Sequence, residues 1–466
     1  MPGESGRTSG RFVTVAMLVT TITALATASV GLWVGGHLNG FICDGACGPE
    51  AAAVPDSLAV TGAPAVADVR VAPASELDAG AVRSAVASAL DDERLGKDVG
   101  FAAVDPRSGE VLATEGAGPL VPASTAKLLT AFAALLTLDP QRRFVTSVVQ
   151  SGNELVLVGG GDPYLMSKPP KQRHPAIRAT LRDLADQTAR ALGGATSVRL
   201  GYDASRFSGP ALNPSWEASY VTEQLVTPIS ALWADQVLRS RPDDPAAAAA
   251  EEFAALLEKR DIDVIGEPTA SVAPRGASPV AEVRGGTVAQ ATELTISASD
   301  NDAAEVLLRQ VAVGAGRPGT FRDGVAVVRE TLREHGVDIT GLTLRDGSGL
   351  SRDDRIAPLT LAQVIAKATA DPRSAGLVAG LPVARFSGSL ENRFAKSEDA
   401  GGVVRAKTGT LTGVHSLAGY VTDQSGVPIA FAVMADKTKD ISGVETEAAL
   451  DRVGEALARC VCSLGR

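Results

Sequence analysis

Pro122-Ala-Ser-Thr-Ala-Lys-Leu-Leu-Thr-Ala131 places a serine and a lysine three residues apart, where the pattern predicts the start of a helix. Apolar residues follow at intervals of three and four until Asp139-Pro140 ends the run. Positions i and i+3 share one face of a helix, so we expect Ser124 and Lys127 to be neighbours. Such a pair can make a serine nucleophilic without histidine. Alone, the spacing more often belongs to a capping serine followed by a solvated lysine.

Two further motifs follow in order, Ser299-Asp-Asn301 and Lys407-Thr-Gly409. Each is common by itself: the first could be a helix-capping turn, and the second a strand that ends in a turn. Together with Ser124-x-x-Lys127 they resemble the motif set of penicillin-binding proteins and class A β-lactamases. Their occurrence together, in this order, therefore predicts one catalytic site.

The residue types suit acyl transfer, which needs a nucleophile, a base, a proton relay and donors to an oxyanion. We expect Ser124 to attack a carbonyl and Lys127 to act as the base. An unperturbed lysine has a pKa of about 10.4, so burial and the charge of Lys407 are expected to lower the pKa of Lys127. Ser299 could pass a proton to the leaving amine, and Asn301 could hold Lys127 and the substrate amide.

From about Ala79 onward the chain resembles the class C low-molecular-mass penicillin-binding proteins, the D-alanyl-D-alanine carboxypeptidase/endopeptidase family. Besides the three motifs, four stretches carry the likeness: Leu155-Val-Leu-Val-Gly-Gly-Gly-Asp-Pro163, Asp203-Ala-Ser-Arg-Phe207, Asp346-Gly-Ser-Gly-Leu-Ser351, and Lys407 to Gly413 with Ser416-Leu-Ala-Gly-Tyr-Val421. His415, Arg385 and Ser389 depart from the family's usual residues, which affects substrate detail rather than the reaction.

The resemblance implies an α+β, penicillin-recognising fold, in which helices flank an antiparallel sheet and a mixed α/β domain is inserted. It implies a serine-type D-Ala-D-Ala carboxypeptidase, or an endopeptidase, that acts on peptidoglycan stem peptides and is inhibited covalently by β-lactam antibiotics. No cofactor or metal is expected. By resemblance, the backbone N–H groups of Ser124 and Thr410 bind the oxyanion, and Lys407, Thr408 and Thr410 bind the terminal carboxylate while Gly409 allows close approach.

The insertion is implied by the resemblance, and the long separation of Ser124 from Ser299 agrees with it. We expect a catalytic domain over residues 79–137 and 286–466 and an inserted domain over 138–285. The patterns predict helices over 79–90, 176–192, 246–259, 359–370 and 446–458 with a broken helical pair over 289–313, and strands within 100–112, 144–149, 154–158, 415–422 and 429–434.

The first 78 residues read as an export segment and a linker. Residues 12–34 are uncharged and follow Arg7 and Arg11, which predicts a single-pass anchor within 1–37 and a cytoplasmic N-terminus. A cleavable signal peptide is the alternative, because Ala26-Thr-Ala28 supplies small residues at the right spacing. An Ala/Pro-rich linker follows over 38–78, and in either case the body lies outside the cytoplasm.

The net charge and the cysteines limit which binding partners and metal sites are expected. The net charge is −10 without a basic tract, which argues against a nucleic-acid partner. The four cysteines lie near the ends of the chain, which favours disulfides over metal ligation and leaves three pairings open. They are Cys43, Cys47, Cys460 and Cys462.

Other reaction classes fit less well. The chain has four scattered histidines, no Gly-x-Ser-x-Gly and no His-Glu-x-x-His, which disfavours a Ser-His-Asp hydrolase and a zinc peptidase. A serine β-lactamase remains the nearest alternative, although no Glu-x-x-Leu-Asn follows Asn301 to activate a deacylating water. A catalytically silent wall-binding protein is disfavoured because every motif residue is intact.

Overall fold

The computed structural model describes residues 76–463 apart from 194–195, 239–240, 278 and 441–442. Residues 73–466 form one compact unit. The predicted anchor, nearly all of the predicted linker, and Cys43 and Cys47 lie outside the described residues. No helix within the described ranges is both long and apolar enough to cross a membrane.

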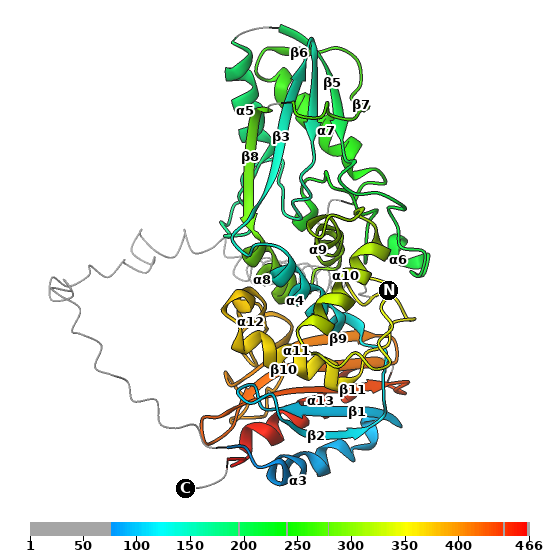
Figure 1. Cartoon of the computed structure of the whole chain (residues 1–466), viewed down its shortest axis with the longest axis vertical. Coiled ribbons are helices and arrows are strands. Elements are labelled where there is room, and N and C mark those ends of the chain that lie inside the picture. The colour runs from blue at the N-terminus through cyan, green and yellow to red at the C-terminus, as the bar shows by residue number, and fades with distance from the viewer. Residues whose placement is uncertain (1–75, 194–195, 239–240, 278, 441–442, 464–466) are drawn as a thin grey trace, which may run out of the picture. The chain divides into compact units, whose positions relative to one another are not determined.

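The first sheet joins the two ends of the described chain. Its five antiparallel strands lie in the order β2-β1-β11-β10-β9 (Figure 1). They are β1 (Asp98–Val104), β2 (Val111–Gly116), β9 (Val404–Leu411), β10 (Val414–Thr422) and β11 (Pro428–Asp436). Strand β9, which carries Lys407, is therefore the edge strand of this sheet, and the outer side of its first part is bridged by Val383, which pairs with Arg405.

Helices cover both faces of this sheet. Along β1, Phe101 and Ala103 enter one hydrophobic core and Ala102 and Val104 the other, as the alternation of a strand requires. One core includes α3 (Ala79–Leu90) and α13 (Val444–Arg459). The other includes residues of α4 (Lys127–Thr137), α8 (Val288–Ala298), α9 (Asn301–Gly314), α10 (Phe321–Glu334), α11 (Pro358–Ala370) and α12 (Ala375–Ala379).

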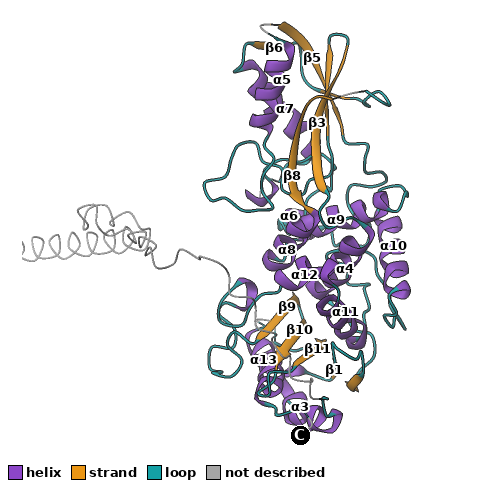
Figure 2. Cartoon of the chain, turned by 60° about the vertical axis from the view of Figure 1, so that its left-hand side comes forward, coloured by secondary structure: helices purple, strands orange, loops and turns teal. Residues whose placement is uncertain are grey.

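A second sheet has the order β6-β5-β4-β3-β8, with β7 paired to β5 (Figure 2). Its strands are β3 (Arg143–Ser151), β4 (Glu154–Val158), β5 (Thr196–Asp203), β6 (Ile262–Val264), β7 (Thr269–Ala270) and β8 (Pro279–Thr287). Strand β5 runs parallel to its neighbours, whereas β3 is antiparallel to both of its own. Helices α5 (Leu181–Leu192) and α7 (Pro245–Glu258) share a core with this sheet.

All strands of the second sheet come from the segment for which we predicted an inserted domain. The division into two domains stays a prediction, because residues 73–466 hold together as one unit. Short helical turns complete the chain: η2 (Glu93–Leu95), η3 (Ala123–Ala126), α6 (Ser219–Thr222), η4 (Gln236–Leu238), η5 (Pro372–Ser374) and η6 (Gly388–Leu390).

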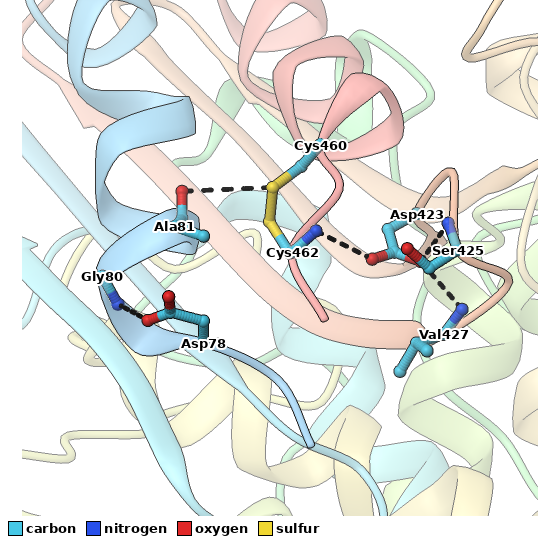
Figure 3. The surroundings of a disulfide bond; sticks show 8 residues. All are labelled: Asp78, Gly80, Ala81, Asp423, Ser425, Val427, Cys460 and Cys462. Carbon is cyan, nitrogen blue, oxygen red and sulfur yellow. Dashed lines mark hydrogen bonds between the residues drawn. A yellow bond between two sulfur atoms is a disulfide. The ribbon is translucent and has the colours of Figure 1, made fainter. Parts of the chain in front are cut away.

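Cys460 and Cys462 form a disulfide at the end of α13 (Figure 3). Of the three pairings that the sequence left open, the structure shows the one in which Cys460 is joined to Cys462. The carbonyl oxygen of Cys462 accepts a hydrogen bond from the backbone N–H of Asp78 at 2.7 Å, and Leu77 forms a β-bridge with Ser463. Residues 462–463 are therefore hydrogen-bonded to residues 77–78, directly before α3.

The predicted helix over 176–192 begins later, at Leu181. The Thr180 hydroxyl accepts a hydrogen bond from the backbone N–H of Asp183 at 3.0 Å, which caps the helix there. The other predicted helices and strands are present within a few residues of their expected bounds.

Candidate active site

Ser124 lies in the 3-10 turn η3, directly before α4, rather than in the α-helix itself. Ala123 has a φ of 47°, an uncommon value for a residue with a side chain. Two glycines allow backbone to approach this turn closely. A Cβ on Gly349 would lie 1.9 Å from the carbonyl oxygen of Ala123, and one on Gly409 would lie 3.1 Å from the backbone nitrogen of Ser124. The turn after Asp346 and strand β9 therefore enclose the serine.

Lys127 is the first residue of α4, and its side chain is buried. Its Nζ lies 2.9 Å from the Oγ of Ser124, 2.7 Å from the Oδ1 of Asn301 and 2.7 Å from the carbonyl oxygen of Ser348. Three acceptors match the three N–H bonds of an ammonium group. The predicted contact between serine and lysine is thus present, together with a contact to Asn301 from the second motif.

Burial lowers the pKa of Lys127 to about 8, against the opposing charges of Asp346 and Glu305. We expected the charge of Lys407 to contribute to this decrease. Desolvation is instead the lowering cause at Lys127, and the repulsion between the two lysines lowers the pKa of Lys407. Lys407 is fully buried, so desolvation is also the larger cause of its pKa lying well below the usual value.

Ser299 and Lys407 form a second bonded pair. The Nζ of Lys407 donates to the Oγ of Ser299 at 2.8 Å and to the carbonyl oxygen of Thr408 at 2.7 Å. Ser299 ends α8 in the left-handed region, with a φ of 55°, before α9 begins at Asn301. Because the chain changes direction here, Ser299 contacts Lys407 and Asn301 contacts Lys127.

Asn301 connects the catalytic lysine to the inserted segment. Its Oδ1 accepts from Lys127, and its Nδ2 donates to the carbonyl oxygen of Leu225 at 2.9 Å. The neighbouring Asp302 pairs with Arg241 at 2.8 Å, so two residues of α9 are held by the segment between β5 and α7. The amide orientation is thereby fixed with its oxygen toward the lysine.

The remaining motif residues line the edge strand. The hydroxyl of Thr408 lies 2.7 Å from the Oγ of Ser389, and the hydroxyl of Thr410 lies 3.3 Å from a carboxylate oxygen of Glu447. With Gly409 beside Ser124, the structure brings the eight candidate residues into one region. Ser389 and Glu447 are polar partners of this edge to which the sequence assigned no role.

Buried carboxylates support the turn behind Lys127. Glu305 accepts from the backbone N–H groups of Gly347 and Ser348, at 3.0 Å and 2.7 Å. Burial, with the charge of Asp346 second, raises the pKa of Glu305 to about 8. The sequence analysis missed Glu305, although it lies four positions after Asn301 and therefore on the same face of α9.

Within the described ranges, no group of three or more histidine, cysteine or acidic side chains is arranged to hold a metal ion. The site places the amine of Lys127, whose pKa is lowered, against the hydroxyl of Ser124. It also places the amine of Lys407, on edge strand β9, against the hydroxyl of Ser299. These groups are suited to acyl transfer.

A family model described as the D-Ala-D-Ala carboxypeptidase 3 (S13) family matches residues 82–240 and 236–457. Carboxypeptidase Rv3627c of Mycobacterium tuberculosis is 37% identical over 417 residues, which cover 85% of this chain and 87% of that protein. Carboxypeptidase DacB of Mycolicibacterium smegmatis is 33% identical over 97% of both chains.

Among solved structures, penicillin binding protein 4 (dacB) from Haemophilus influenzae matches with a TM-score of 0.66 at 22% identity, over 81% of this chain and 98% of that one. At this level of identity the likeness concerns the fold. It confirms the predicted penicillin-recognising fold, an antiparallel sheet flanked by helices.

Proposed function

Because this chain belongs to the D-Ala-D-Ala carboxypeptidase 3 (S13) family, we propose that it removes the terminal D-alanine of peptidoglycan stem peptides through an acyl-enzyme on Ser124. The chain is a serine-type D-Ala-D-Ala carboxypeptidase, as the sequence predicted. The single observation that carries the proposed mechanism is the 2.9 Å contact between Ser124 and Lys127, a lysine whose pKa burial lowers to about 8.

Acylation begins with Lys127 in its neutral form. The proton of the Ser124 hydroxyl passes to Nζ while Oγ attacks the carbonyl carbon of the penultimate D-alanine. The backbone N–H groups of Ser124, in η3, and of Thr410, in β9, stabilise the oxyanion, because donors held by the backbone need no reorganisation during the reaction. When the tetrahedral intermediate collapses, the C–N bond breaks and the proton that Lys127 took from Ser124 passes through the hydroxyl of Ser299 to the leaving amine, so that Lys127 is neutral again. Lys407, 2.8 Å from Ser299, assists this transfer.

Hydrolysis of the ester completes the cycle. Water attacks the acyl carbon, its proton passes to the basic group beside Ser124, and the serine leaves with a proton regained. Lys127 remains in contact with Ser124, Asn301 and Ser348 and is the group placed to act here. The same attack on the carbonyl of a β-lactam ring opens the ring and leaves a covalent penicilloyl ester, which accounts for the proposed inhibition.

We assign substrate binding to the edge strand. Thr408 and Thr410 are placed to contact the terminal carboxylate, with Lys407 supplying positive potential behind them and Gly409 permitting close approach. Asn301 orients Lys127 and the substrate amide.

For location, residues 12–34 are proposed as a membrane anchor or a cleaved signal segment that exports the enzyme. N-terminal sequencing of the mature protein distinguishes the two, because only a signal segment is removed.

Fluorescent penicillin tests the nucleophile. The full chain should be labelled covalently, Ser124→Ala should not be labelled, and Ser108→Ala, at an exposed turn, should be labelled like the wild type. Labelling that survives Ser124→Ala would overturn the assignment. Release of D-alanine from a pentapeptide, compared with turnover of a cephalosporin, separates a carboxypeptidase from a β-lactamase. Cleavage of cross-linked dimers in the same assay shows whether the enzyme is also an endopeptidase.

A further inference from the structure

A pocket of about 730 Å³ is lined by α10, by residues between 210 and 215, and by Leu344, Arg345 and Asp353, and by none of the eight candidate site residues. Figure 1 shows the position of α10. Three arginines of α10 line it, and Arg345 lines it from the other side. The spacings of seven and four residues place the three on one face of the helix. They are Arg322, Arg329 and Arg333.

Among the described residues, no carboxylate pairs with these four guanidinium groups, and Arg329 donates to the carbonyl oxygen of Leu342. The lining includes two acids, but Glu330 pairs with Arg317 at 2.7 Å, outside the set. No ion pair joins any of the four arginines to Asp353 or to another acid in the part of the chain that the structure describes. The net charge of the chain is −10, but these arginines, which form no ion pair with the described residues, create a positive electrostatic potential at the pocket. That potential favours the binding of an anion.

The floor of the pocket is apolar. Phe321, Val325 and Leu344 line it and are buried against the core. Guanidinium groups above an apolar floor suit a ligand that has both carboxylates and short aliphatic side chains.

A chain of contacts links this pocket to the catalytic lysine. The ring of Phe321 packs edge-on against that of Trp216, with 5.5 Å between centroids, and the indole Nε1 of Trp216 donates to Asp346 at 2.7 Å. Asp346 also accepts from the backbone N–H of Gly349, in the turn whose Ser348 carbonyl oxygen accepts from Lys127. The turn formed by residues 346–349 therefore contacts both Lys127 and Trp216, the residue that packs against Phe321 of the pocket.

We propose that this arginine pocket binds a second stem peptide of the peptidoglycan polymer through its carboxylates, while the peptide to be cleaved lies at Ser124. This inference rests on the proposed function, because that function makes the substrate a polymer in which carboxylate-bearing peptides recur. A polymer held at two points raises the effective concentration of the scissile peptide at the active site. The ligand class is a short peptide with at least two carboxylates.

Calorimetric titration with the dipeptide L-Ala-γ-D-Glu tests the pocket directly. The probe carries two carboxylates and has no D-Ala-D-Ala bond, so binding does not depend on turnover. The full chain should bind it, and Arg322→Ala/Arg345→Ala should weaken binding about tenfold or more, since two charge-assisted contacts are lost. Arg199→Ala, which removes an exposed arginine outside the pocket, is the matched control and should bind like the wild type.

Three outcomes would overturn the proposal: unchanged binding in the double variant, equal binding of the dipeptide with both carboxylates amidated, or displacement by inorganic triphosphate at lower concentration than by the dipeptide. The last would assign the pocket to a phosphate polymer. A kinetic arm separates this inference from the proposed function. In the double variant, the ratio of kcat/KM for sacculi to that for diacetyl-L-Lys-D-Ala-D-Ala should decrease about tenfold. Wild-type protein without activity on either substrate would instead refute the proposed function, and the titration would still report on the pocket.

Discussion

The Nζ atom of Lys127 and the Oδ1 atom of Asn301 lie 2.7 Å apart, although 174 positions separate the two residues in the chain. This contact joins the start of α4 to the start of α9 and places a polar acceptor against a buried amine. The amide oxygen is neutral, so it orients the lysine without a full negative charge that would keep the amine protonated. Four predictions follow from this region and from the buried acids around it.

The rate of acylation should increase with pH through about 8. Lys127 must be neutral to accept the serine proton, and burial lowers its pKa from the ordinary value to about 8. The measurement is the second-order rate constant of penicillin acylation from pH 6 to 9.5. Lys127→Ala should reduce this constant by about a hundredfold or more. A rate that is flat across the range would exclude this lysine as the base.

Asn301→Asp should move the same pH profile to higher pH. A carboxylate 2.7 Å from Nζ favours the charged amine, so the pKa of Lys127 increases and less neutral lysine is present at pH 8. Asn153→Asp, in an exposed turn, adds the same charge without this contact and should leave the profile in place. A shift to lower pH in Asn301→Asp would contradict the geometry.

Glu305→Ala should destabilise the fold by about 2–4 kcal/mol, because two buried backbone N–H groups lose their acceptor at a cost of about 1–3 kcal/mol each. These are the N–H groups of Gly347 and Ser348. Glu305→Gln keeps one acceptor oxygen and should cost less than half as much. Urea unfolding measures both, and equal losses in the two variants would show that the hydrogen bonds are not the cause.

Asp162 should make the protein less stable as pH rises from about 4 to 7. Burial raises the pKa of Asp162 from 3.8 to about 7 in the folded state. Between these values the folded protein binds a proton that the unfolded chain does not, so the free energy of unfolding decreases with pH, by about 1.4 kcal/mol per pH unit at most. Asp162→Asn removes the group, and the difference in unfolding free energy between variant and wild type should therefore change with this slope. A constant difference would show that Asp162 stays ionised.

The candidate site was largely predictable because its residue types recur at fixed spacings. The proposed chemistry depends on the side chains of five motif residues, and the identity of a side chain can be read from the sequence. They are Ser124, Lys127, Ser299, Asn301 and Lys407. The carbonyl oxygen of Ser348 was not predictable, since every residue carries one and only the fold brings this one to Lys127.

The balance of charge also depended on the fold. We expected burial and the charge of Lys407 to lower the pKa of Lys127; burial does so and Lys407 does not contribute, and the extent of burial is a property of packing.

Among the secondary-structure elements, patterns with clear periodicity and capping were predicted well, as for α3 and α11. Helix α10 was missed, although its apolar residues recur at helical intervals between Thr320 and Glu334. Strand β8 was missed because its alternation is interrupted by Gly285 and Gly286, which fit close contacts with Asp162 and Ala176. Those contacts cannot be inferred from the local sequence.

The pairing of β1 with β11 has a consequence for biogenesis. Residues 98–104 cannot complete their sheet until residues 428–436 have been synthesised, and the turn that holds Ser124 cannot pack against Gly409 before strand β9 has been made. Contacts this distant in sequence form slowly and expose unpaired strand edges in the meantime. An emerging chain therefore holds its nucleophile without the cation and edge strand that complete the site. We therefore expect hydrolytic activity only after residues 404–436 have been synthesised and have paired in the sheet.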